Sequence, residues 1–207
     1  MAAALTHGEG RTGRATRERP DPTTVTRMVR AAASGDHRAW DALVDEFGGL
    51  VWAITRAHRL SDADAADVAG ATWLRLVEHL GDLREADRVG AWLATTARRE
   101  CLRVLRGAQR QVPTGDDIEA APADATDIAS ELMAAQRDVA LWRAFARLPE
   151  RDQALLRLLV ADPAPSYEEI SAALEMPIGS IGPTRARSLE RLRRELARDG
   201  LVAADTF

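Results

Sequence analysis

Apolar residues recur every three or four positions along most of this chain of 207 residues, and this spacing constrains the fold more than any other feature. Such a repeat places apolar side chains on one face of an α-helix, whereas a half-buried strand alternates every two residues. No segment alternates convincingly at a period of two. We therefore expect an all-α protein, and the 46% of hydrophobic residues can supply its core.

Residues 24–110 are predicted to be helical throughout. Asp36 can cap a helix whose apolar positions run to Ile54, although Gly48-Gly49 favours a bend or break. Ser61 begins the next helix, with Ala66, Ala69, Trp73, Leu76, Val77 and Leu80 expected on its inner side. A polar segment, 81–88, follows it. The last helix places Leu93, Ala97, Cys101, Val104 and Leu105 inward.

The chain changes composition after this helical part. From Gln111 to Gln136 there are six acidic residues and no arginine, and prolines and glycine interrupt the segment. This composition predicts a flexible acidic linker between two small helical domains. The predicted division is a disordered tail at 1–22, a domain at 23–110, the linker at 111–127, a four-helix domain at 128–200 and a short tail at 201–207. We expect no large extension after Gly200.

The second domain ends in a helix-turn-helix pattern. Ser166 can cap the first helix and Glu169 stands three residues later, which is the arrangement of a capping box. A turn, Met176 to Gly179, follows, and Pro183 suits the first turn of the second helix. Leu189, Leu192 and Leu196 form the packing face of that helix, and arginines form the opposite face.

Two arginine faces favour a nucleic-acid partner despite the net charge of -4. In a helix-turn-helix, the start of the second helix reaches base edges and flanking cations bind phosphates. The predicted DNA contacts are Ser180, Thr184, Arg185, Arg187, Ser188, Arg191 and Arg194. A second face carries Arg99, Arg103, Arg106 and Arg110. The stripe on the helix-turn-helix, by itself, fits a solvated bundle helix equally well.

Catalytic and metal-binding chemistry finds no support in the sequence. The four histidines are scattered, none stands at metal-ligand spacing with Cys101, and no phosphate-binding glycine loop occurs. We predict no enzymatic activity, no metal, no cofactor and no small-molecule substrate. No apolar run reaches the length of a membrane span or signal peptide, and one cysteine excludes an internal disulfide. We expect a cytoplasmic protein without membrane insertion.

Two sets of motifs occur together along the chain. The first comprises Ser61–Val68, Thr72–Leu76 and Ala91–Arg99, and the second comprises Leu148–Arg151, Ser166–Ile170 and Gly179–Leu189. In order and spacing, these motifs resemble the sigma-70 family of RNA polymerase specificity factors, in its compact two-domain extracytoplasmic-function (ECF) group. The resemblance covers most of residues 24–198, and an ordered set of motifs is more specific than a helix-turn-helix alone.

The resemblance implies a role for each domain. Domain 23–110 would correspond to sigma region 2, which docks on the polymerase clamp helices and recognises and melts the minus-ten element. The implied polymerase contacts are Asp64, Asp67, Arg75 and Glu78, and the implied minus-ten contacts are Arg88, Arg98, Arg99, Arg103 and Arg106. Loop 82–88 would capture a flipped base, which must leave its stack to be read. Domain 128–200 would correspond to region 4 and read the minus-thirty-five element.

Two functions stay open at this point. The favoured one is a transcription initiation factor that binds core RNA polymerase, directs it to specific promoters and aids promoter melting. An anti-sigma factor is a further candidate partner. The family motif Asp-Val-Val-Gln-Glu, however, is replaced by Asp67 to Ala71 with Gly70 inside it, and glycine weakens a helix by roughly 1 kcal/mol relative to alanine. The alternative is a helix-turn-helix DNA-binding regulator with weak or lost polymerase docking.

Overall fold

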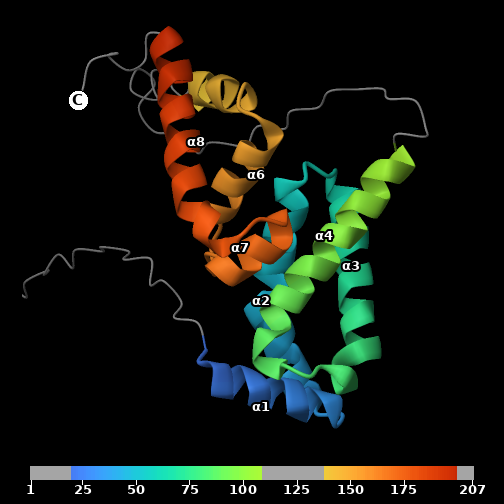
Figure 1. Ribbon diagram of the computed structural model, residues 1–207. Helices are drawn as coiled ribbons and strands as arrows, with labels where there is room; N and C mark the ends of the chain where they lie inside the picture. The colour runs from blue at the N-terminus through green and yellow to red at the C-terminus, as the bar shows by residue number, and fades with distance from the viewer. Residues whose placement is uncertain (1–19, 109–137, 200–207) are drawn as a thin grey trace, which may run out of the picture.

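The computed structural model describes residues 20–108 and 138–199, and every regular element within these ranges is helical (Figure 1). The prediction of an all-α fold is therefore confirmed. The predicted linker at 111–127, the tail at 201–207, Arg110 and most of the tail at 1–22 lie outside the described residues.

Four α-helices form the N-terminal part. They are α1 (Pro22–Ala33), α2 (His37–Ala57), α3 (Asp62–His79) and α4 (Val89–Ala108), and two short 3-10 helices, η1 (Leu80–Asp82) and η2 (Ala86–Arg88), join α3 to α4. Side-chain oxygens of Asp36 and Ser61 accept hydrogen bonds from backbone N–H groups at the starts of α2 and α3. These caps, which the sequence predicted, satisfy donors that have no partner within the helix.

Helix α2 continues through Gly48-Gly49, so no break occurs there. A tertiary contact accounts for the glycine at position 49. A Cβ built on Gly49 would lie 2.8 Å from Cδ of Pro163, far closer than two carbon atoms can approach. Gly49 therefore allows a distant segment to pack closely on α2, and it does not interrupt the helix.

The buried face of α3 is rotated from the predicted one. Its buried residues are Ala65, Val68, Thr72 and Leu76, while Ala66 and Val77 are exposed. The Thr72 hydroxyl donates a hydrogen bond of 2.7 Å to the Val68 carbonyl, which allows a polar residue to be buried. Alanines that occur on several faces of this helix made the pattern ambiguous.

The C-terminal part contains a helix at 138–146, then α6 (Glu150–Leu159), α7 (Tyr167–Leu174) and α8 (Ile178–Arg198). The capping box of Ser166 and Glu169 is confirmed, with both hydrogen bonds formed. Helix α7 ends at Glu175, whose φ of 51° is left-handed.

Helix α8 begins earlier than predicted. Pro177 is its N-cap, so Ile178 and Gly179 belong to the helix and not to the turn. Pro183 consequently lies in the second turn of α8, and the prediction that it occupies the first turn is wrong. A proline there cannot donate to the carbonyl four residues earlier, on Gly179, but that glycine is exposed and accessible to water.

The two halves of the described chain share one hydrophobic core. It contains Leu43, Leu50 and Leu93 from the N-terminal helices together with Leu155, Ile170 and Ile181 from the C-terminal helices. Figure 1 shows the corresponding arrangement, in which α7 lies against α4 and α6 lies against α2. A smaller cluster, Phe145, Leu148 and Leu156 with Leu192, holds α8 to α6. The domain boundaries themselves stay a prediction.

Candidate nucleic-acid and polymerase interfaces

The start of α8 presents an unoccupied cationic surface. Arg185 and Arg187 are exposed, and neither forms an ion pair with another residue of 20–108 or 138–199. Nη2 of Arg187 donates a hydrogen bond of 3.2 Å to the hydroxyl of Thr184, which is partly exposed. Three residues predicted to contact DNA therefore lie together with their polar groups accessible.

The two serines predicted to contact DNA have different positions. Ser180 is partly exposed and its hydroxyl donates a 2.7 Å hydrogen bond to the Pro177 carbonyl. Ser188 is fully buried and donates to the Thr184 carbonyl at 2.9 Å. It lies seven residues after Ile181, on the same inner face of the helix. The burial contradicts the prediction that Ser188 contacts DNA.

The second half of α8 is bound to the rest of the protein by ion pairs. Nη1 of Arg191 lies 2.5 Å from Oδ2 of Asp152, a buried residue of α6. Arg147 forms ion pairs of 2.7 Å with both Glu195 and Asp199 near the end of α8. The hydrogen bond from Arg147 lowers the pKa of the Glu195 carboxyl. Arg191 therefore fixes α8 against α6, and Arg147 fixes the end of α8 against the segment before α6.

Arg194 differs from its neighbours in this half of the helix. It is strongly exposed, and its Nε is 3.9 Å from the nearest carboxylate oxygen, on Glu190. Together with Arg147, Arg191 and Arg198 it lines a polar hollow. Of the two arginines predicted to bind DNA in this half of α8, Arg194 is the less constrained.

The arginines near α4 divide into two groups. Arg88, just before the helix, and Arg98, at its middle, pair with carboxylates from the C-terminal half: Arg88 Nε lies 2.8 Å from Glu168, and Arg98 pairs with Glu175. Nη1 of Arg88 also lies 2.7 Å from Glu85. The Arg98 side chain is only 21% exposed. Both residues were predicted to contact the minus-ten element, and both are engaged by residues at the ends of α7.

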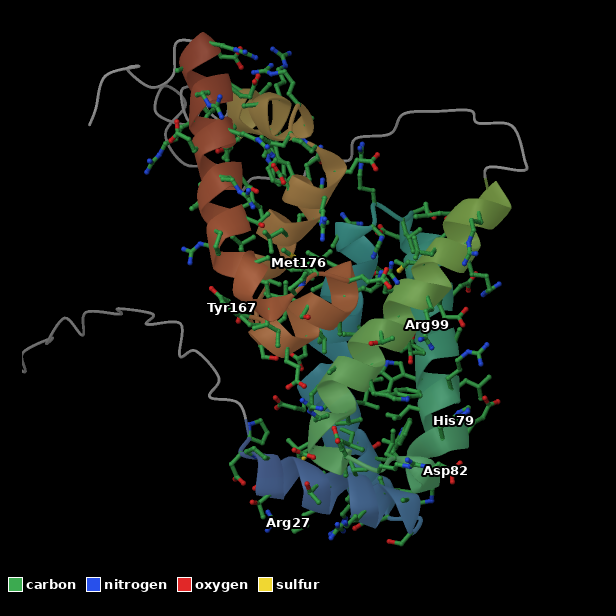
Figure 2. All side chains as sticks on the ribbon, in the orientation of Figure 1. Arg27, His79, Asp82, Arg99, Tyr167 and Met176 are labelled. Carbon is green, nitrogen blue, oxygen red and sulfur yellow. The ribbon has the colours of Figure 1, made fainter. Side chains whose placement is uncertain are left out.

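The second group lies further along α4 and faces solvent. Arg99, Arg103 and Arg106 are exposed, and Figure 2 shows Arg99 on the side of α4 away from α7. Nε of Arg106 donates to the carbonyl of Leu102 at 2.9 Å, and Arg103 pairs with Glu100. Three of the five arginines predicted near the minus-ten element therefore form an accessible surface.

The contact between α4 and α7 is unusually close. A Cβ built on Gly90 of α4 would overlap the carboxylate of Glu169, the capping residue of α7. His58 lies at the same junction, and burial, followed by the nearby charge of Arg98, lowers its pKa. Its Nε2 is buried without a hydrogen-bond partner among the described residues. Glycine at position 90 is what allows the two helices to meet.

The outer face of α3 carries the residues predicted to bind polymerase. Asp67 and Glu78 are exposed, whereas Asp64 accepts a 2.7 Å hydrogen bond from the Ser61 hydroxyl and so belongs to the cap. Arg75 is half-exposed and pairs with Glu100. On this face, Asp67 and Glu78 are therefore available to a partner, whereas Asp64 and Arg75 are bonded within the protein.

The same face of α3 also has an apolar part, which the sequence pattern did not indicate. Leu74 is 60% exposed and Val77 is 56% exposed; Leu74 follows Gly70 by four residues, and Val77 follows Leu74 by three. A Cβ on Gly70 would meet nothing within 4 Å, so Gly70 makes no close contact within the protein. The helical spacing of Leu74 and Val77 is visible in the sequence, but the prediction that Val77 faces the interior is wrong.

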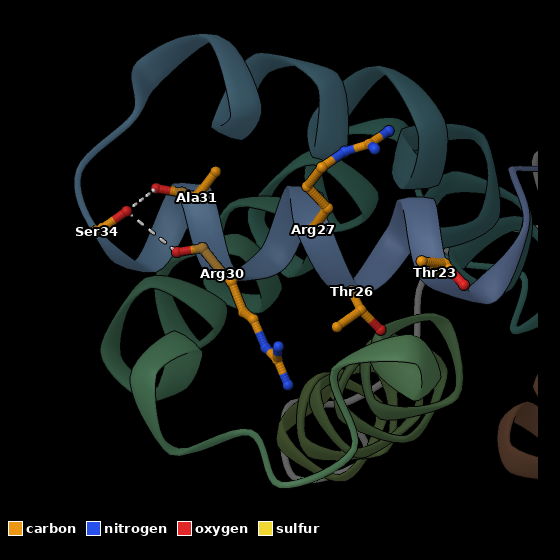
Figure 3. A pocket seen from close by; sticks show the side chains of 6 residues that line it. All are labelled: Thr23, Thr26, Arg27, Arg30, Ala31 and Ser34. Carbon is orange, nitrogen blue, oxygen red and sulfur yellow. Dashed lines mark hydrogen bonds between the residues drawn. The ribbon is translucent and has the colours of Figure 1, made fainter.

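A third arginine surface, formed by Arg27 and Arg30, lies on the outer face of α1. The sequence pattern did not indicate it. Figure 3 shows them on either side of a shallow hollow that Thr23, Thr26, Ala31 and Ser34 also line. Neither forms an ion pair with a residue of the described ranges. Helix α1 itself packs on η1 and η2, which belong to the segment predicted to capture a base.

Other chemistry in the described ranges is sparse. Cys101 is fully buried, and burial raises the pKa of its thiol to about 12, as expected for an inert packing residue. No group of three potential metal ligands occurs among residues 20–108 and 138–199. Within the same ranges, no helix is both long and apolar enough to cross a membrane.

Comparison with known proteins agrees with this arrangement. The model of the family sigma-70 region 2 matches residues 43–111, which include most of α2 and all of α3 and α4. The ECF RNA polymerase sigma factor RpoE of Cereibacter sphaeroides is 31% identical over 189 residues, covering 87% of this chain and 99% of the relative. The chain belongs to the ECF group of the sigma-70 family. This sigma factor is thus a member of a family of transcription initiation factors.

A solved structure shares the fold of the sigma factor. The structure of CnrH in complex with the cytosolic domain of CnrY matches with a TM-score of 0.57 at 19% identity, covering 85% of this chain and 99% of CnrH. The match extends over both halves of the chain, which agrees with an all-helical ECF architecture.

Proposed function

We propose that this sigma factor binds core RNA polymerase, directs it to two-part promoters and assists promoter melting, without enzymatic activity of its own. The observation that carries the proposal is the presence of two accessible arginine surfaces, on α4 and at the start of α8, in a chain of this family. Two separated cationic surfaces suit two separated DNA elements. The place of action would be the cytoplasm, where polymerase and promoter are found.

The start of α8 is the proposed reader of the minus-thirty-five element. Thr184, Arg185 and Arg187 are accessible and Ser180 lies one turn before Thr184, so this end of the helix can enter a major groove. An arginine can bind a guanine edge with two hydrogen bonds. Arg194 would bind a phosphate. Arg191 would do so only with the part of its guanidinium that Asp152 leaves exposed.

The exposed side of α4 is the proposed minus-ten surface. Arg99, Arg103 and Arg106 can reach DNA without any rearrangement. Arg88 and Arg98 can do so only if they leave Glu168 and Glu175, which requires α7 to separate from α4. We infer that the bound form of the protein is more open at this junction, with loop 82–88 then free to capture a base.

The outer face of α3 is the proposed polymerase-docking surface. Asp67 and Glu78 would provide charged contacts, and the exposed Leu74 and Val77 would provide apolar ones. Exposed apolar side chains that cluster on one face are typical of interaction sites. This apolar part supports docking despite Gly70-Ala71, since contact area replaces polar pairs. We also propose a protein inhibitor of the anti-sigma kind, because CnrH was solved with the cytosolic domain of a second protein.

The decisive experiment is transcription in vitro. The purified sigma factor is mixed with core polymerase and a library of promoter fragments, and the transcripts are sequenced. We expect start sites that depend on the factor and share two upstream elements. Absence of any such start site would overturn the proposal. Co-purification with core polymerase separates this function from that of a DNA-binding regulator without polymerase docking, which would bind DNA alone.

A further inference from the structure

Glu100 is a buried carboxylate in the middle of α4, with a side chain that is 7% exposed. Its Oε1 accepts a 2.9 Å hydrogen bond from Nε of Arg75 on α3, and its Oε2 accepts a 2.6 Å hydrogen bond from Nε of Arg103. The hydrogen bond from Arg103, and then that from Arg75, lower the pKa of Glu100 against the opposing effect of burial. The carboxylate is therefore ionised and bridges two helices.

The two arginines are held in the same way. Each binds Glu100 through Nε, the guanidinium nitrogen nearest the chain, and neither forms another ion pair with the described residues. The Arg75 side chain is 52% exposed and that of Arg103 is 65% exposed, so their terminal nitrogens remain accessible. A free arginine must lose much rotational freedom when it binds an anion, whereas these two are already oriented.

We propose that Glu100 is a positioning residue that orients Arg103 for a promoter phosphate and Arg75 for a carboxylate of the polymerase. The inference rests on the proposed function, because it takes α4 as the DNA surface and α3 as the polymerase surface. One buried anion would then support both interfaces of this part of the sigma factor. Arg75 and Arg103 make the contacts, and Glu100 acts only through them.

The direction in which neutralising Glu100 changes DNA affinity distinguishes positioning of Arg103 from simple electrostatics. Glu100 is an anion close to a surface that binds an anion, so neutralising it should strengthen DNA binding if charge alone matters. If Glu100 positions Arg103, neutralising it should weaken DNA binding. Glu100→Gln keeps the shape of the side chain and changes only its charge and hydrogen bonding.

The test measures binding of the complete holoenzyme to a promoter fragment over a range of salt concentrations. For Glu100→Gln we expect a roughly two- to tenfold loss of affinity, because an Arg103 that is no longer oriented fails to hold its phosphate. We also expect the slope of log affinity against log salt to fall by about 1, as one phosphate contact is lost. Arg103→Gln should give a similar slope, and the double variant should be no weaker than Arg103→Gln.

A second readout addresses Arg75. Affinity for core polymerase, measured without DNA, should fall in Glu100→Gln and in Arg75→Gln by similar factors. Asp41→Asn is the charge-matched control, because Asp41 is exposed on α2 and forms no ion pair with the described residues. It should leave both affinities as in the unmodified protein.

Several results would overturn the inference. Promoter binding by Glu100→Gln that is equal or tighter, with an unchanged salt slope, would leave Glu100 as a packing residue only, whatever its effect on thermal stability. If Glu100→Gln does not fold, Glu100→Asp keeps the charge but is too short to reach both arginines, and unchanged binding by that variant would have the same meaning. Failure of the proposed function is distinguishable from failure of this inference, because the unmodified holoenzyme would then select no promoter.

Discussion

Helices α4 and α8 both carry arginines at helical spacing, yet they use them in opposite ways. In α8 the arginines near the start are free, and those near the end are paired within the C-terminal half, as Arg191 is with Asp152. In α4 the arginine at the middle of the helix, Arg98, is paired across the two halves with Glu175, and those further along are accessible. The α8 pairs can persist when the halves separate, but the pair of Arg98 with Glu175 must break.

The two kinds of pair also differ in burial. Asp152 is buried, so removing it leaves Arg191 without its main partner at a packed junction. Arg88 and Glu168 are both about half-exposed, and pairs of that kind contribute only about 0.2–1 kcal/mol. The pair of Asp152 with Arg191 therefore maintains structure, whereas the pair of Arg88 with Glu168 is weak enough to exchange for another anion.

The largest expected effect comes from closing the space between α4 and α7. Gly90→Ala would place a methyl group on the Glu169 carboxylate and beside Phe47. We expect a loss of about 3 kcal/mol in unfolding free energy, measured with urea, because the core there cannot relax easily. The radius of gyration from small-angle X-ray scattering should rise as the halves separate.

Gly107→Ala is the matched control on the same helix. Nothing lies within 4 Å of a Cβ at Gly107, so alanine there should stabilise the protein by up to about 1 kcal/mol. Equal effects of the two substitutions would contradict the close contact between α4 and α7.

The second effect concerns the pairs that stay within the C-terminal half. Asp152→Ala should lower the unfolding free energy by about 2 kcal/mol, since it removes a charged hydrogen bond at a buried position. The measurement is urea unfolding. Glu190→Ala, whose carboxylate is 3.9 Å from Arg194, should change stability by less than about 0.5 kcal/mol. A large loss of unfolding free energy in Glu190→Ala with none in Asp152→Ala would contradict the structural role of the pair of Asp152 with Arg191.

The third effect tests the free end of α8. Arg187→Ala should weaken recognition of the minus-thirty-five element by about 1–3 kcal/mol, as loss of a base contact typically does. Start-site selection and promoter affinity of the holoenzyme are the measurements. Thermal stability should not change, because Arg187 is exposed and bonds only to Thr184. Unchanged start-site preference would show that Arg187 reads no base.

A smaller effect is expected from the pairs that cross the halves. Glu168→Gln with Glu175→Gln should release Arg98 and leave Arg88 paired with Glu85 alone, and so strengthen DNA binding by the free sigma factor by about 1 kcal/mol, measured by fluorescence anisotropy. Asp41→Asn with Asp45→Asn removes the same charge from an exposed part of α2 and should have little effect. Equal gains in both double variants would indicate net charge alone.

The smallest effect is that of pH on the same junction. Since burial lowers the pKa of His58, the folded protein takes up this proton less readily than the unfolded chain. Stability should therefore fall as pH drops from 7.5 through roughly 6.5, where the unfolded histidine gains its charge. Urea unfolding of His58→Gln over this range should show a weaker dependence on pH. An identical dependence would assign the effect to other groups.

Local signals in the sequence predicted local features well. The caps at Asp36 and Ser61 and the box of Ser166 with Glu169 depend on residues within one turn, so the sequence contains all the information they need. The burial of Ser188 could not be recognised in this way, because a serine is compatible with either face of a helix. The role of Gly49 depended on Pro163, which is distant in the chain.

The amino-acid sequence by itself determined the all-helical class, most helix starts, the two arginine helices and the resemblance to ECF sigma factors. Only the tertiary structure decided which arginines are available. The reason is that helical spacing specifies the face of a side chain but not its partner, and the decisive partners are remote: 39 residues separate Arg191 from Asp152, and 77 separate Arg98 from Glu175. Which arginines are available to a partner therefore depends on the carboxylates that folding brings to them.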